Sequence, residues 1–202
     1  NHPADVELAM KSLYEAIEHS GHATSLFLLM RLIEGSEECI KRGITPSTIL
    51  SEGKVLNVGL ETDDSEKVIP MNLVNVLSSA GIDIRGLDPN IETEGLYKKG
   101  IVQNMPFGNE EFDTVISSGL FDPDYVGVLA IDNGLSNDID GYTEWFYEVS
   151  AKEMNRILKD GGICLINSNK NSDILTEAFA RNGFEHVNID SSGGRLFIKK
   201  IG

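Results

Sequence analysis

The chain has 202 residues, which is long enough for one well-buried domain and short for two. Hydrophobic residues make up 41% of the sequence and charged residues 24%, as in an ordinary soluble globular protein. The formal net charge of −15 argues against a nucleic-acid partner, because a phosphate backbone is bound by clustered Lys and Arg side chains.

The first 50 residues are predicted to be helical. Apolar residues recur at helical spacing over residues 4–19, with Gly21 expected to end that helix. A second helix follows around residues 26–33, apolar almost all round and therefore buried, and residues 37–42 continue helically. These helices either pad a sheet or form a lid over a ligand cleft. We therefore expect residues 1–50 to be an N-terminal helical cap or lid segment.

Residues 51–202 are expected to form an α/β domain that makes one compact structural domain with the N-terminal segment. Strands alternate with helices, which predicts a mostly parallel sheet with helices on both faces and a closing antiparallel hairpin. Residues 121–140 are predicted to be either a long loop or a loop with short helical pieces, and a loop of that length in a compact domain is often functional. The expected elements, in chain order, are strand 54–59, helix 66–80 with Pro70 in its first turn, strand 82–88, helix 92–98, strand 101–103, strand 112–118, helix 142–158, strand 163–167, a helix capped by Asp173, strand 184–189 and strand 196–201.

The two cysteines, Cys39 and Cys164, are far apart and lack the spacing of a metal or redox motif. Cys164 lies in an apolar run and is expected to be a buried, reduced thiol, which fits a cytoplasmic setting. No apolar segment is long enough to predict a membrane span.

Five separate stretches carry a resemblance to a known family. Residues 55–59 form a strand that ends in a glycine, and Asp88 ends the next strand. A turn over residues 105–109 leads to the Phe112-Asp113 pair. The other two stretches are Glu153 to Gly162, with a glycine-glycine turn, and Asn182-Gly183-Phe184. In this order the five stretches resemble the class I S-adenosylmethionine-dependent methyltransferases, especially the broad small-molecule group called type 11.

The resemblance implies a Rossmann-like class I methyltransferase fold with a mostly parallel seven-stranded sheet and an antiparallel C-terminal hairpin strand. It also implies S-adenosylmethionine as the cofactor, with Asp88 holding the ribose hydroxyls and no dedicated catalytic side chain, since methyl transfer rests mainly on positioning. The residues expected to line the cofactor pocket are Gly59, Leu60, Asp88, Gln103 and Ser118.

The cofactor loop departs from the family pattern. That pattern is an acid followed by three glycines at alternate positions, whereas this chain has Asn57, Gly59, Glu61 and Asp63. Glycines let backbone N–H groups approach the cofactor's carboxylate, and acids there would add bulk and like charge. Asp63, together with Asp64 and Glu66, can instead serve a helix N-terminus, with Asp64 or Ser65 as its cap. Ile101 stands where the family often has an acid for the adenine amino group.

Other chemistries are less consistent with the sequence. A dinucleotide-binding loop would need glycines at positions 61 and 64. The acids of residues 122–140 lack the spacing of a calcium loop, so no metal site is predicted. The histidines, namely His2, His19, His22 and His186, are scattered and expected at the surface, although His19 and His22 could reach a cleft.

Two functions from different classes follow from these patterns. The first is an S-adenosylmethionine-dependent methyltransferase that acts on an unknown small molecule. The second is a methyltransferase-like binding or regulatory protein that has lost cofactor binding and acts on a protein partner. Neither nucleic acid nor a membrane is an expected partner, and the oligomeric state does not follow from the sequence.

Overall fold

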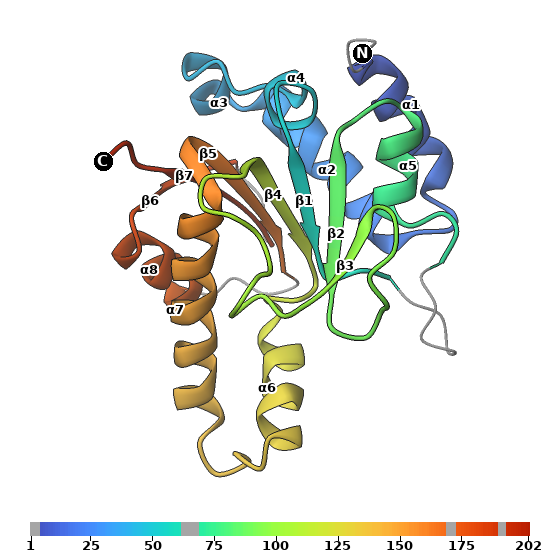
Figure 1. The fold of residues 1–202 in the computed structure, drawn as a ribbon. Coiled ribbons are helices and arrows are strands. Elements are labelled where there is room, and N and C mark those ends of the chain that lie inside the picture. The colour runs from blue at the N-terminus through green and yellow to red at the C-terminus, as the bar shows by residue number, and fades with distance from the viewer. Residues whose placement is uncertain (1–4, 62–68, 169–172, 190–192) are drawn as a thin grey trace.

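A computed structural model describes residues 5–61, 69–168, 173–189 and 193–202 (Figure 1). Its centre is a seven-stranded sheet in the order β3-β2-β1-β4-β5-β7-β6. Strands β1 to β5 pair in parallel, and β7 is antiparallel to both β5 and β6. The expected parallel sheet with an antiparallel hairpin strand is therefore confirmed. The strands are β1 (Val55–Val58), β2 (Ile84–Asp88), β3 (Tyr97–Lys99), β4 (Phe112–Ser118), β5 (Leu158–Asn167), β6 (Phe184–Val187) and β7 (Gly194–Lys199).

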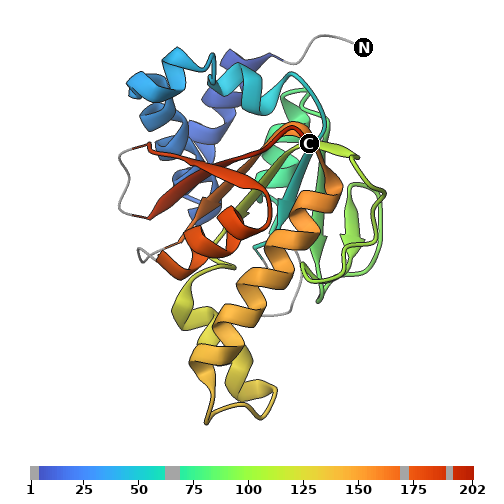
Figure 2. The ribbon, with the colours of Figure 1, turned by 90° about the vertical axis from the view of Figure 1, so that its left-hand side faces the viewer.

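Helices cover both faces of the sheet (Figures 1 and 2). Side chains alternate between the faces along each strand, so that Val55 belongs to one hydrophobic core and its neighbour Leu56 to the other. The first core is shared with α1 (Val6–Ala16), α2 (Gly21–Gly35), α3 (Glu37–Lys41), α4 (Pro46–Leu50) and α5 (Leu73–Ser79). The second is shared with α6 (Pro123–Asp132), α7 (Ile139–Ile157) and α8 (Asp173–Arg181).

The N-terminal helices are separated by serine and threonine caps. Ser20 caps α2 through a hydrogen bond from the Ala23 N–H to its Oγ, 3.0 Å long. Gly21 is thus the first residue of α2, and the expectation that it ends the preceding helix was wrong. Pro46 is the first residue of α4, where a missing N–H costs nothing. The domain boundary at residue 50 stays a prediction.

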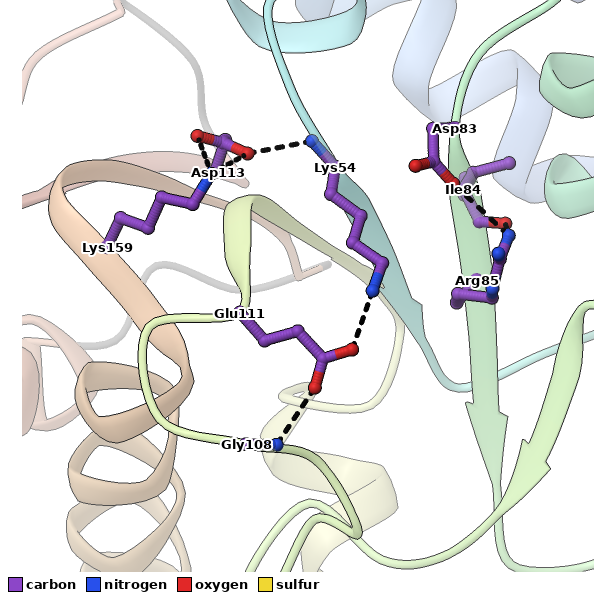
Figure 3. A network of polar contacts seen from close by, with 8 residues as sticks. All are labelled: Lys54, Asp83, Ile84, Arg85, Gly108, Glu111, Asp113 and Lys159. Carbon is purple, nitrogen blue, oxygen red and sulfur yellow. Dashed lines mark hydrogen bonds and ion pairs between the residues drawn. The ribbon is translucent and has the colours of Figure 1, made fainter.

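An ion-pair network fastens the amino-terminal edge of the sheet (Figure 3). The Lys54 Nζ donates to Glu111 at 2.6 Å, and the Lys54 N–H donates to Asp113 at 2.8 Å. Lys159 reaches the same Asp113 carboxylate from the start of β5. Hydrogen bonding to Lys54 lowers the pKa of Glu111. The Phe112-Asp113 pair therefore has a structural role, because Asp113 joins β1, β4 and β5 at this edge.

The turn over residues 105–109 is held against α7. Arg156 donates to the carbonyl oxygens of Met105 and Phe107 at 3.0 and 2.9 Å. Glu153 accepts from the Met105 N–H at 2.8 Å and pairs with Arg156, and the hydrogen bond from Arg156 lowers the pKa of Glu153. Two of the stretches that carried the family resemblance are thus bonded to each other.

Three predicted elements were wrong. Helix α5 begins at Leu73, not in the 60s, because the Asn72 side chain caps it by accepting from the Asn75 N–H; Pro70 lies before the helix. Residues 92–98 form no helix. Strand β3 lies at Tyr97–Lys99, and the expected strand 101–103 is reduced to a bridge between Ile101 and Asn104.

Residues predicted as a long loop contain helix α6. Asp122 caps it by accepting from the Asp124 N–H, and Pro123 takes its first position. Together α6 and the first half of α7 extend beyond the carboxyl-terminal edge of the sheet (Figure 1). The predicted cap positions Asp64 and Ser65 lie outside the described residues, and Asp173 is the first helical residue of α8.

Candidate functional site

A cavity of about 1050 Å³ opens at the carboxyl-terminal ends of β1, β2 and β4. In open parallel sheets this edge, where the strand order reverses between β1 and β4, is where ligands bind. The volume is at the upper end of the range for small-molecule sites. The cavity is therefore the best candidate for a ligand site in the described part of the chain.

All five residues predicted to line a cofactor pocket line this cavity. They come from three separate strand ends and one connection, namely Gly59 and Leu60 after β1, Asp88 at the end of β2, Gln103 after β3, and Ser118 at the end of β4. Ile101 lines it as well, with 47% of its side chain exposed. The structure thus brings the set together, while its role in cofactor binding stays a prediction.

Asp88 and the first loop are locked to each other. One Asp88 oxygen, Oδ2, accepts from the Leu60 N–H at 3.1 Å, and the other, Oδ1, accepts from the Asn90 N–H at 2.8 Å. Asp88 as a whole is 7% exposed, so these two bonds offset much of the cost of burying its carboxylate. Gly59 has a φ of +81°, which favours glycine, and its N–H donates to the Leu87 carbonyl. Two loop N–H groups are therefore already bonded within the protein.

The Glu61 side chain does not add bulk and charge to the cofactor loop, which is what the altered sequence of that loop suggested. Its carboxylate accepts from the Ser20 hydroxyl and, at 3.1 Å, from the His22 N–H, at the N-terminus of α2. That position favours a negative charge because of the unsatisfied N–H groups and the helix dipole. Glu61 is not among the residues that line the cavity. The expected bulk and charge at position 61 are directed at a helix end, and Asp63 lies outside the described residues.

His22 lines the cavity, although a surface position was expected for it. The other described histidines, His19 and His186, are exposed as predicted. The His22 Nδ1 is buried and has no hydrogen-bond partner among the described residues. Burial lowers the pKa of His22, and the nearby Glu61 carboxylate opposes that shift. The ring is therefore largely neutral near pH 7. The sequence hint was its expected place in the turn between two helices, from which it could reach a cleft.

The cavity continues between α6 and α7, at a segment that the sequence predicted to be functional but did not predict to contain the helix α6. Its apolar walls there are Tyr125 and Leu129 of α6, Leu135 of the connection, and Tyr142, Trp145 and Phe146 of α7. We call these six residues the α6–α7 extension. The signal that could have found it is Asp122-Pro123, a cap followed by a first-turn proline, ahead of apolar residues at helical spacing.

The charge of the lining is negative. Asp88 and Asp138 contribute carboxylates, and the described lining contains neither Lys nor Arg. Burial, and then the carboxylates of Asp88 and Asp132, raise the pKa of Tyr125, so its phenol stays neutral. Such a site disfavours anions and favours ligands that carry positive charge. In the described chain no cluster of three potential metal-binding side chains occurs, and no helix has the length and apolarity to cross a membrane.

No family model and no curated protein matches this sequence. Solved structures, in contrast, do match this chain. A TehB-like S-adenosylmethionine-dependent methyltransferase from Corynebacterium glutamicum is 17% identical with a TM-score of 0.52, over 99% of this chain and 100% of that chain. A possible histamine N-methyltransferase from Thermotoga maritima is 15% identical, with a TM-score of 0.46 over 97% and 100% of the two chains. The antibiotic-resistance methyltransferase Kmr is 15% identical, with a TM-score of 0.48 over 75% and 88%.

At such identities the likeness to the Corynebacterium protein shows the fold alone. Strand order, antiparallel hairpin and flanking helices define a Rossmann-like α/β protein. More particularly, the chain has the class I methyltransferase fold. The fold does not by itself determine an activity.

Proposed function

We propose that the protein is an S-adenosylmethionine-dependent methyltransferase that acts on a small molecule. The observation that supports this most directly is the placement of Asp88, a buried carboxylate at the end of β2 in a cavity large enough for cofactor and acceptor together. Membership of the type 11 group belongs to the same proposal.

The chemistry of the lining fits this cofactor. S-adenosylmethionine carries a sulfonium and an ammonium group against one carboxylate, and the lining carries Asp88 and Asp138 without Lys or Arg. When bound, the cofactor supplies an electrophilic methyl group.

The chain's own residues would bind the cofactor and orient it. Asp88 would accept hydrogen bonds from ribose hydroxyls while keeping its bonds to Leu60 and Asn90, since a carboxylate offers about four acceptor positions. Ile101 would pack on the adenine face. Gln103 and Ser118, which both line the cavity, would supply polar contacts at its two sides. Rate enhancement would come from holding the reactants in line and excluding water.

A second candidate is a binding protein with this fold that does not take the cofactor. One observation favours it: the Gly59 and Leu60 N–H groups, which lie where a cofactor carboxylate would seek donors, are bonded to Leu87 and Asp88. A carboxylate would have to displace those bonds or find other donors. The two candidates differ in a single measurable property, the affinity for S-adenosylmethionine.

Calorimetric titration with S-adenosylmethionine and with its demethylated product, S-adenosylhomocysteine, tests the proposal. We expect heat of binding and a rise in melting temperature with both. The absence of both signals at millimolar ligand would overturn the methyltransferase proposal and leave the binding protein.

Asp88 variants test the location of the site. We expect Asp88→Ala to weaken binding about tenfold or more, because it removes a charge-assisted hydrogen bond to the ligand. Asp88→Asn keeps an oxygen for a backbone N–H and separates ligand effects from folding effects. The matched control is Asp83→Ala, an exposed acid before the other end of β2 that pairs only with Arg85 among described side chains. Equal effects of Asp83→Ala and Asp88→Ala would place the site elsewhere.

A further inference from the structure

The α6–α7 extension exposes large apolar side chains at the mouth of the cavity. Tyr125 is 45% exposed, Leu135 44% and Trp145 50%, and Ile101 faces the same cavity. Covering such surface is favourable by about 25 cal/mol per Å². Exposed apolar residues that gather around one cavity, unlike scattered ones, mark a place where an apolar ligand binds.

The extension is rich in aromatic faces. The Tyr142 ring lies 5.3 Å from that of Trp145 and is stacked at 6.3 Å on that of Phe146. Phe146 is buried and fixes the base of this group, while Trp145 is half exposed. Aromatic faces attract cations as well as other rings. The walls therefore suit a flat ring and tolerate a positive charge beside it.

The connection between α6 and α7 contributes an acidic residue, Asp138, to the same cavity. Asp138 caps α7, where its Oδ1 accepts from the Gly141 N–H at 3.2 Å. Asp138 is one of the residues that line the cavity, and so is Asp88 at the end of β2. The described lining offers no cation to pair with an acidic ligand. Charge complementarity thus separates amines from carboxylic acids of the same shape.

We propose that the α6–α7 extension, with Asp138, binds a small ring-bearing amine as the methyl acceptor, the ring lying against Trp145 and Tyr142 and the amino group facing the carboxylates. The amine would bind as an ammonium ion and give up one proton to solvent before transfer, because only the neutral nitrogen has the lone pair that forms the new N–C bond as the S–C bond of the sulfonium breaks. The products would be the methylated amine and S-adenosylhomocysteine. The inference rests on the proposed methyltransferase function, because it assigns the acceptor side of that cavity. The binding itself does not depend on the cofactor and is measured without activity.

Three probes of similar size test the ligand class: 2-phenylethylamine, 2-phenylethanol and 3-phenylpropionate. Trp145 is the only tryptophan of the chain, so selective excitation of indole fluorescence reports on this cavity alone. We expect the amine to bind about tenfold tighter than the acid, with the alcohol between them. Equal affinity for all three overturns the charge assignment, and no binding of the amine at about 10 mM overturns the inference.

Charge variants are compared by calorimetry. Asp138→Asn keeps an oxygen that can cap α7 and removes only the charge. We expect it to weaken amine binding about threefold to fivefold, as an exposed ion pair would. The matched control is Asp140→Asn, which makes the same charge change in the first turn of α7 but does not line the cavity. Equal effects of the two variants overturn the role of Asp138.

Ring variants use the same method. Tyr125→Ala should weaken all three probes, whereas Tyr14→Ala, which removes an equally large exposed ring outside the cavity, should leave them unchanged. Tyr125→Phe should retain binding if the ring rather than the hydroxyl matters. Loss of affinity with Tyr125→Phe equal to that with Tyr125→Ala overturns the role of the Tyr125 ring in the α6–α7 extension.

The outcomes separate the two proposals. Binding of S-adenosylhomocysteine without binding of the amine overturns the acceptor class and leaves the methyltransferase proposal intact. Binding of the amine in the predicted order, without any binding of S-adenosylhomocysteine, overturns the methyltransferase proposal and with it the role of methyl acceptor. Binding of both supports the acceptor site.

Discussion

Replacing Glu61 with alanine should destabilise the protein far more than an ordinary loop mutation would. The carboxylate accepts from the Ser20 hydroxyl and the His22 N–H. Ser20 is 3% exposed, so its hydroxyl would lose its acceptor in a place that water hardly reaches. Each hydrogen bond to a charged group contributes about 1.5–3 kcal/mol, so the two bonds to Glu61 together contribute about 3–6 kcal/mol. Part of that is recovered by relaxation around the N-terminus of α2, so we expect a loss of about 2–3 kcal/mol.

Urea unfolding followed by circular dichroism measures this loss. For a domain of this size it corresponds to a fall in melting temperature of about 5–10 °C. Glu61→Gln keeps one acceptor oxygen and should lose about half as much. The matched control is Glu34→Ala. Glu34 pairs with Arg31 on the exposed surface of α2, and its loss should cost less than about 1 kcal/mol.

A double-mutant cycle with Ser20→Ala isolates the contact. Ser20→Ala also removes the cap of α2, which by itself costs about 1 kcal/mol. If the two side chains act together, the double variant should lose less unfolding free energy than the two single losses added together, by about 1 kcal/mol or more. Additive effects, or a Glu61→Ala variant as stable as the parent protein, would refute the conclusion that this loop acid serves the helix end.

Three further results are expected. Burial lowers the pKa of His22, so the unfolded chain binds a proton at this residue at a higher pH than the folded chain does. The contribution of His22 to stability is therefore complete above about pH 6.5 and is lost as the pH falls below that value. When the free energy of unfolding is measured against pH, its dependence on pH in this range should be smaller in His22→Gln than in the parent protein. Gly59→Ala should cost about 1–2 kcal/mol through its positive φ, measured by urea unfolding, because an added Cβ meets only Leu120 at an ordinary 3.6 Å. Cys39 and Cys164 are both buried, and burial raises the pKa of Cys164. A thiol reagent should therefore label neither cysteine until the protein unfolds. Labelling of the folded protein as fast as that of an exposed thiol would contradict this packing.

The sequence by itself determined the central strands. β4 was predicted with the bounds that the structure has, and β1 within one residue, because strands buried on both faces are continuous apolar runs that differ from everything around them. Asp88 was placed correctly at a strand end for the same reason. The edge strand β3 was missed, since Tyr97 to Lys99 pair on one side only and carry no such run.

Only the tertiary structure decided the use of single polar residues. Glu61 was visible in the sequence as an acid in a loop that expected glycine, but its partners Ser20 and His22 lie about forty residues earlier in the chain. Where a side chain points depends on which helix packs beside it, and no local pattern contains that information. For His22 the sequence left two positions open, the surface or a cleft, and only the packing of α2 shows that it lines the cavity.

The candidate site divides in the same way. Its sheet side, Gly59 to Ser118, could be predicted because parallel strands bring their carboxyl ends to one edge whatever the connections between them are. For its helical side the sequence indicated only that residues 121–140 are functional; the lining side chains could not be predicted, because the α6–α7 extension exists only where two helices pack against each other beyond that edge. Local periodicity determines which segments form strands. The width and lining of a cavity are set by contacts between segments that the chain keeps apart.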